Sequence, residues 1–295
     1  MSTTLVTVTD TAKPETTTEA PPELRSDQVA VFLSGVGHVR GGVGTFISDL
    51  HLTSLQVLRN LSLYYTPVGS ALGESTATRL TTLSSVQPVF FADMSRTIFN
   101  QESGLGTLQI RGGSLDELNV SATVFNKSNP AGTYGSAIPS LRSDRAIAPG
   151  ESMFIPGLVG SSETGRTNMI IQETSGDDAS VTVDFLDTEG GVVSTVGATV
   201  PGFQHARMND VVPMGAVAAM ITNDAGSAGN ILAFATPVDQ GGDTWVVTDW
   251  PRVHGYAPDS AVVVPVAGRV IGRNNNFFRT SLAVINQSQN PATVD

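Results

Sequence analysis

The sequence predicts an all-β protein made of tandem antiparallel β-sandwich domains. Three observations favour this class: apolar and polar residues alternate in short runs, turn-forming residues separate these runs, and a unit of roughly one hundred residues recurs along the chain. Charged residues make up only 15% of the 295 residues. This is too little charge for long salt-bridged helices or coiled coils.

Strand-like alternation is clearest at residues 61–65, 120–124, 181–185 and 282–285, where Val, Ile, Leu and aromatic residues alternate with Ser, Thr and Asp. Glycine pairs and Asn- or Asp-rich clusters lie between such runs and predict turns. The stretch 214–220 is compatible with a short helix and with a strand, and the sequence does not decide between them.

The internal repeat is clearest where APGESMFIP at 148–156 aligns with APDSAVVVP at 257–265. GRTNM at 165–169 aligns in the same way with FRTSL at 278–282, and FISDL at 46–50 is a degenerate first copy. This period is too long for a solenoid repeat and matches a whole sandwich domain. We therefore expect four segments: a flexible Thr/Pro-rich tail at 1–24, a first sandwich at 25–147, a second at 148–256, and the incomplete start of a third at 257–295.

The last segment holds too few strands to close a sandwich of its own. Two interpretations remain open. The chain is a piece of a longer array, or the last segment is a hairpin donated to the sheet of a neighbouring protomer.

A family resemblance rests on VVVPVA at 262–267, FRTSL at 278–282 and NQSQNPATV at 286–294. Together these runs resemble the tandem immunoglobulin-like β-sandwich repeats of large secreted or surface-attached bacterial proteins. Residues 126–139 are similar to the closing segment of such a unit. The first copy departs from the pattern, with Ile47-Ser48 where the other copies have Arg-Thr. The resemblance implies a non-catalytic module in an extended array at the cell surface or outside the cell, with neighbouring repeat domains as partners.

Composition narrows the partners further. The net charge of −11 argues against nucleic acid and anionic membrane, because both repel an acidic protein. No apolar run approaches the roughly 18 residues of a membrane span, so no membrane insertion is expected. The N-terminus has neither the basic nor the apolar region of a signal peptide, so any export signal is expected outside this segment. The absence of cysteine excludes disulfides and thiolate metal sites.

Catalytic motifs are not found, and the sequence predicts neither an enzyme nor a cofactor. The four histidines have no zinc-helix spacing, and no G-x-S-x-G elbow occurs. The glycine-rich run 35–41 is one residue too long for a dinucleotide-binding motif, so we interpret it as a hairpin turn. Loose acidic clusters at 177–178, 184–189 and 239–243 leave calcium as an alternative to a solvated acidic face.

Candidate binding residues are aromatic. Trp245 and Trp250 flank a short strand and point to opposite faces, so one is expected in the core and the other is free to stack on a sugar ring or contact a surface protein. We expect binding contacts on loops at one end of each sandwich, near Trp250, Tyr256 and Tyr134, and these three form the candidate binding set. Arg166 and Arg279 begin equivalent strands, and we expect both to fix the preceding loop by donating hydrogen bonds to its carbonyls.

The leading functional hypothesis is a structural or adhesive spacer, in which tandem sandwiches hold a functional head away from a surface. The alternative is a module that binds carbohydrate or protein through its loops. A hydrolase is disfavoured, because the two complete units differ in loop length and not in added polar pocket residues.

Overall fold

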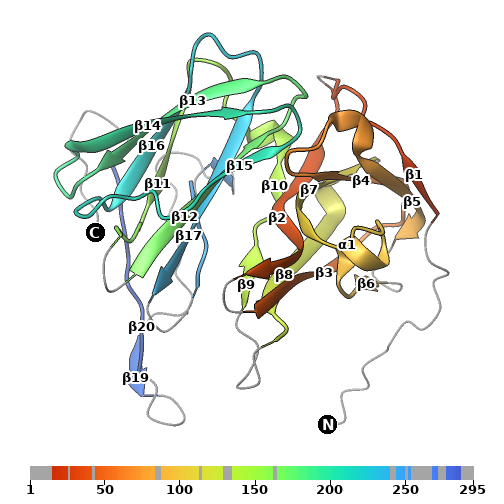
Figure 1. Ribbon diagram of the computed structural model, residues 1–295, viewed down its shortest axis with the longest axis horizontal. Helices are drawn as coiled ribbons and strands as arrows, with labels where there is room; N and C mark the ends of the chain where they lie inside the picture. The colour runs from red at the N-terminus through yellow and green to blue at the C-terminus, as the bar shows by residue number, and fades with distance from the viewer. Residues whose placement is uncertain are drawn as a thin grey trace.

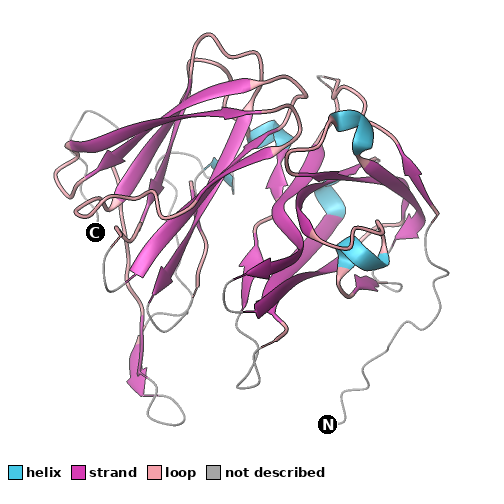
Figure 2. Cartoon of the chain, in the orientation of Figure 1, coloured by secondary structure: helices cyan, strands magenta, loops and turns pink. Residues whose placement is uncertain are grey.

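The protein is all-β in this computed structural model, and its sheets are antiparallel. Figure 1 shows two bodies side by side, the first coloured red to yellow-green and the second green to blue. Helices are confined to short turns, drawn in cyan in Figure 2. The structure describes residues 15–25, 27–41, 44–83, 88–112, 115–128, 135–161, 165–239, 244–249, 252–253, 268–271 and 277–286.

The N-terminal body is one described sheet of ten strands that folds around a single core. Its strands are β1 (Thr16–Thr18), β2 (Ala30–Gly41), β3 (Gly44–Ser54), β4 (Leu58–Pro67), β5 (Thr76–Leu83), β6 (Val89–Phe91), β7 (Gly104–Arg111), β8 (Leu118–Asn126), β9 (Gly135–Ile138) and β10 (Leu141–Arg142). Four short helical turns lie beside them: η1 (Leu72–Glu74), α1 (Met94–Thr97), η2 (Leu115–Glu117) and η3 (Ser143–Arg145).

The C-terminal body consists of two four-stranded sheets that enclose a second core. Its strands are β11 (Ser152–Pro156), β12 (Gly165–Glu173), β13 (Ala179–Leu186), β14 (Val192–Val200), β15 (His205–Met208), β16 (Ala218–Asn223), β17 (Ile231–Asp239) and β18 (Val247–Thr248). A separate hairpin of β19 (Arg269–Ile271) and β20 (Phe277–Arg279) projects below this body in Figure 1.

The two bodies have the same strand order. The path β5-β4-β7-β2 of the first matches β14-β13-β16-β11 of the second. The pairs β6-β3, β3-β8 and β8-β9 likewise match β15-β12, β12-β17 and β17-β18. The first body differs in that β2 continues into a paired hairpin with β3, which joins both of its halves into one sheet, and in that it has two additional strands, β1 beside β5 and β10 beside β2.

Strand alternation sorts the side chains of both bodies. The predicted strands at 61–65, 120–124 and 181–185 lie in β4, β8 and β13, and most of their apolar residues face the cores. Residues 282–285, predicted as a strand, belong to the described segment 281–286, which has no regular structure. The stretch 214–220 turns first and then enters β16, because β16 is hydrogen-bonded between β11 and β13 and this pairing outweighs local propensity.

The glycine-rich run 35–41 is not a hairpin turn, which corrects the interpretation from sequence. It lies within β2, where the pairing with β7 shifts register between Ser34 and Val36. Gly35 occupies the left-handed region there, with φ of 78°. Gly35 is therefore the extra residue of a β-bulge, which bends the strand.

Part of the segment expected as a flexible tail is ordered. Thr16–Thr18 form β1, which pairs with β5 and adds an edge strand to the first sheet. Threonine is common in linkers, but its branched Cβ also favours strands, so composition does not separate the two states. Residues 1–14 lie outside the described residues, and the proposed boundaries after 24, 147 and 256 stay predictions.

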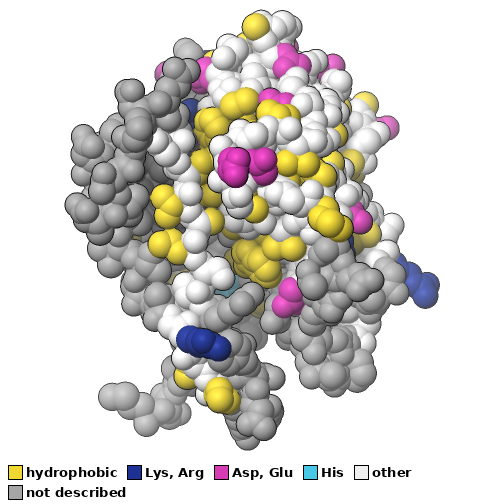
Figure 3. Space-filling view, turned by 90° about the vertical axis from the view of Figure 1, so that its left-hand side faces the viewer, with side chains coloured by type: hydrophobic (Ala, Val, Ile, Leu, Met, Phe, Trp, Pro, Cys, Tyr) yellow, Lys and Arg dark blue, Asp and Glu magenta, His cyan; other side chains and the backbone are white. Residues whose placement is uncertain are grey.

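The surface of the molecule is mixed in character. Figure 3 shows one side, on which apolar side chains lie in small groups among polar and acidic ones. Among the helices within the described residues, none is long and apolar enough to cross a membrane.

Candidate functional site

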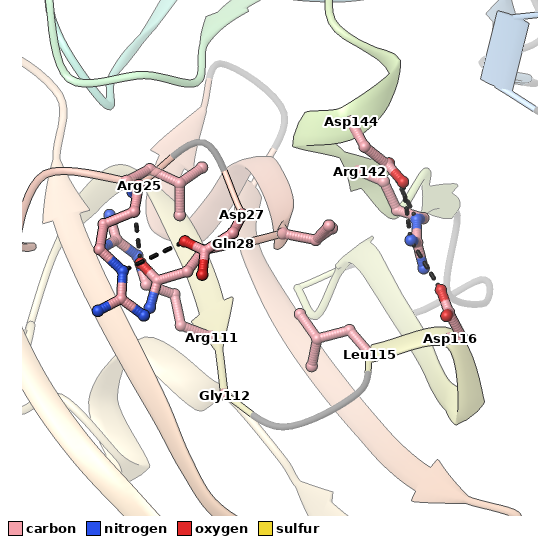
Figure 4. A pocket seen from close by; sticks show the side chains of 11 residues that line it. Arg25, Asp27, Gln28, Arg111, Gly112, Leu115, Asp116, Arg142 and Asp144 are labelled. Carbon is pink, nitrogen blue, oxygen red and sulfur yellow. Dashed lines mark hydrogen bonds and ion pairs between the residues drawn. The ribbon is translucent and has the colours of Figure 1, made fainter.

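A cavity of about 510 Å³ opens where the N-terminal segment, the end of β7 and the turn after β10 meet. Figure 4 shows the side chains that line it. Three arginines and three aspartates are among them, so the walls are strongly polar. The lining residues are Leu24, Arg25, Asp27, Gln28, Val29, Arg111, Gly112, Leu115, Asp116, Arg142 and Asp144.

Two of these arginines are neutralised by aspartates. Arg142 Nη2 lies 2.8 Å from Asp116 Oδ1 and 2.8 Å from Asp144 Oδ2. The hydrogen bond between Arg142 and Asp144 raises the pKa of Arg142 and lowers the pKa of Asp144. On the opposite wall, Arg25 Nε lies 3.3 Å from Asp27 Oδ1, and both side chains are exposed. Exposed pairs of this kind contribute little stability, so they leave the walls adaptable.

The third arginine, Arg111, has no acidic partner within ion-pair distance among the described residues. Its residue is only 8% exposed, and Nη1 donates a 2.5 Å hydrogen bond to the Pro22 carbonyl. Nε and Nη2 have no acceptor in the described part of the chain. Burial lowers the pKa of Arg111 to about 10, because water no longer stabilises its charge.

Aromatic rings hold the Arg111 guanidinium in place. Its central carbon lies 5.5 Å from the ring centroid of Tyr64, in the same sheet, and 5.0 Å from that of Phe203, in the C-terminal body. Both distances are typical of cation–π contacts. Arg111 therefore lies at the junction of the two bodies, and the cavity is next to their interface.

The interface itself has a hydrogen-bonded polar centre. The buried side chain of Gln172 on β12 accepts through Oε1 from Ser34 Oγ at 2.6 Å and from Thr107 Oγ1 at 2.9 Å. Thr107 Oγ1 also lies 2.9 Å from Nδ1 of His205. Because the single hydroxyl proton of Thr107 is used toward Gln172, His205 must donate through Nδ1, which leaves Nε2 as a buried acceptor.

Apolar contacts flank this polar centre. Phe32 and Phe203 stack with their ring centroids 6.5 Å apart, in a cluster with Ala30, Leu24 and Leu72. On the other side, Leu141 of β10 packs on the outward face of the C-terminal sheet, together with Ile170, Leu232 and Phe234. Strand alternation explains the positions of Phe32, Ile170, Leu232 and Phe234, since their neighbours in sequence face the two cores.

A buried carboxylate positions Phe203. Glu173 is fully buried, and its carboxylate accepts hydrogen bonds from the backbone N–H groups of Ser175, Gly176, Phe203 and Asn230, at 2.6, 2.8, 2.8 and 3.2 Å. Burial raises the pKa of Glu173, and these donors act in the opposite direction. The network holds Phe203 at φ of 55°, a left-handed conformation that a bulky residue rarely adopts.

The residues predicted as binding sites cannot be compared with this cavity. Trp250, Tyr256 and Tyr134 all lie outside the described residues, so their role stays a prediction. Trp245 was predicted to flank the same short strand as Trp250. Trp245 is 40% exposed and lies beside β18.

The two predicted structural arginines lie on strands. Arg166 is the second residue of β12, and its side chain is exposed. Burial lowers the pKa of Arg207, and the charge of Arg166 adds to this effect. Arg279 is the last residue of β20, and its side chain is not among those described. The loop contacts expected of both arginines stay a prediction. In the described part of the chain, no group of three or more His, Asp and Glu side chains is placed to hold a metal ion.

Sequence reasoning missed Arg111, Gln109 and Thr107, which share the outward face of β7. The signal was present as TLQIR at 107–111, where polar residues alternate with Leu108 and Ile110. Such a polar set normally faces solvent, and nothing in the local sequence indicates that another body covers it.

No protein-family model matches the chain, and neither does any curated protein. Among solved structures, the lectin from Pleurotus ostreatus in complex with GalNAc is 10% identical, with a TM-score of 0.20 over 81% of this chain and 86% of the lectin. The apo form of the same lectin is 11% identical, with a TM-score of 0.14 over the same shares. Scores this low show no common fold, and no function is assigned from them.

Proposed function

We propose that this chain is a rigid, non-catalytic structural module, built of two immunoglobulin-like sandwich units, that acts as a spacer at a cell surface or outside the cell. The strand order that the two bodies share supports the tandem-unit part of this proposal. The observation that carries the spacer part is the buried interface between the bodies, because a spacer transmits distance and direction only when its units keep a fixed relative orientation.

The interface favours one orientation. Ser34 and Gln172 are fully buried and Thr107 is 1% exposed, and these side chains hydrogen-bond across the boundary. A rotation of one body would break these bonds and leave the groups buried without partners, at a cost of about 1–3 kcal/mol for each group. The stacked Phe32 and Phe203 rings add apolar area that would be exposed by the same rotation.

Pulsed electron-spin resonance tests this rigidity. The chain has no cysteine, so cysteines introduced at Arg59 and Thr199, which are exposed on β4 and β14, accept spin labels without competing sites. We expect one narrow distribution of distances between the labels, because the two bodies form a single rigid unit.

A charge placed in the interface supplies the comparison. Ser34→Glu puts a carboxylate on the outward face of β2, so it should separate the bodies, leave both cores intact and broaden the distance distribution. Ser121→Glu, at an exposed position of β8, is the matched control and should leave the distribution narrow. A wild-type distribution as broad as that of Ser34→Glu would contradict the proposal.

A further inference from the structure

The cavity beside Arg111 contains a charge that the described residues do not neutralise. Arg142 is paired with Asp116 and Asp144, and Arg25 is paired with Asp27. Arg111 is more than nine-tenths buried, lines the cavity and has two N–H groups without an acceptor. Buried guanidinium groups without an anionic partner are costly, so this one calls for an explanation.

The free atoms of Arg111 define a specific shape. Nε and Nη2 form one edge of the planar guanidinium, and Nη1 is already used by the Pro22 carbonyl. Two parallel N–H bonds from one such edge match the two oxygens of a carboxylate. The Tyr64 and Phe203 rings fix the direction of this edge, which reduces the entropy lost when a ligand binds.

The remaining walls limit what else the ligand carries. Asp27, Asp116 and Asp144 offer carboxylate oxygens, which accept hydrogen bonds from hydroxyl groups and repel a second negative charge. A ligand with one carboxylate and several hydroxyls satisfies both conditions. A phosphate with two charges is disfavoured by the same aspartates.

We propose that this cavity binds a small hydroxylated monocarboxylate, of the class of acidic sugars, with its carboxylate against the Nε–Nη2 edge of Arg111. The site needs the two bodies in contact, because the Phe203 ring that holds Arg111 belongs to the C-terminal body, but it does not rest on the spacer role. Since Nε and Nη2 are buried, binding of the carboxylate requires side chains around Arg111 to rearrange.

Titration with sodium glucuronate, followed by the Nε–Hε resonances of arginine in ¹⁵N-labelled protein, tests this proposal. We expect saturable binding with a Kd of roughly 1 mM, accompanied by a shift of the Arg111 resonance, which the spectrum of Arg111→Lys identifies by its absence. Glucose, which lacks the carboxylate, should cause no shift, and inorganic phosphate should compete at least tenfold more weakly.

Variants separate shape from charge. Arg111→Lys keeps the positive charge but loses the planar edge, so glucuronate affinity should fall about tenfold or more. Arg59→Lys, at an exposed position outside the cavity, is the matched control and should bind like the wild type. If Arg111→Lys does not fold, calorimetric titration of the wild type decides instead, with saturable heat expected for glucuronate and none for glucose. The proposal is overturned if glucuronate leaves the Arg111 resonance unchanged, if phosphate binds equally well, or if Arg111→Lys retains full affinity.

Discussion

Nδ1 of His205 and the hydroxyl oxygen of Thr107 lie 2.9 Å apart across the boundary between the two bodies. Both residues are almost fully buried, and this contact extends the hydrogen bonds that Gln172 accepts. The imidazole is therefore held neutral at an interface, in a position where a proton would be costly.

The first prediction concerns pH. Burial, assisted by the charge of Arg207, lowers the pKa of His205 to about 4 from an ordinary value near 6.5. The unfolded chain then binds the proton first as pH falls, so the contribution of His205 to stability is complete above about pH 6.5 and is lost toward pH 4. The full loss is on the order of 3 kcal/mol.

Urea unfolding of the wild type and His205→Asn at several pH values measures this contribution. Asparagine keeps a donor near the position of Nδ1 and does not titrate. Comparison with this variant is needed because Glu173, whose pKa is raised by burial, changes stability with pH in the opposite direction. Parallel pH profiles for the two proteins would exclude a buried neutral His205.

The second prediction concerns Glu173. Glu173→Gln replaces one acceptor oxygen by an amide that donates, so it leaves some of the N–H groups of Ser175, Gly176, Phe203 and Asn230 without partners. We expect the free energy of unfolding to fall by about 2–3 kcal/mol. Glu189→Gln, at an exposed turn, is the control, and equal stabilities of the two variants would contradict the structural role of Glu173.

The third prediction concerns the bulge in β2. A Cβ atom on Gly37 would lie 2.1 Å from the carbonyl oxygen of Gly104 in β7, which is a backbone atom of a paired strand. Gly37→Ala should therefore cost about 2 kcal/mol or more, by forcing the strands apart. Gly73→Ala has open space around its Cβ and should change stability by less than about 0.5 kcal/mol in the same thermal melt. Equal melting temperatures would refute the close approach.

The fourth prediction concerns the aromatic stack at the interface. Phe203 is 2% exposed and contacts both the Phe32 ring and the Arg111 guanidinium. Phe203→Ala removes both contacts, so denaturant unfolding should show a loss of about 3 kcal/mol. Phe90→Ala, which truncates a ring that is 51% exposed, serves as the control and should cost less than about 1 kcal/mol. A small effect of Phe203→Ala would mean that the bodies separate readily.

Much of the strand content was predictable from local patterns. The alternation at 61–65 and 181–185 identified β4 and β13, because the side chains of a strand alternate between two faces whatever the rest of the fold does. The run 35–41 was misinterpreted as a turn, because glycine serves both hairpins and bulges and only the pairing with β7 separates them. The candidate site was not predictable, since its residues come from the N-terminal segment, β7 and β10.

The all-β class and the core-facing residues were therefore already contained in the order of the amino acids, because burial of every second side chain leaves a periodic record in the chain. Only the tertiary structure decided whether the opposite faces of the strands are buried or exposed to solvent. Gln109 and Arg111 are polar residues that alternation assigns to solvent, yet they are 2% and 8% exposed. A strand cannot encode in its own sequence whether water or a second folded body will cover its outer face, because that depends on contacts between residues far apart along the chain.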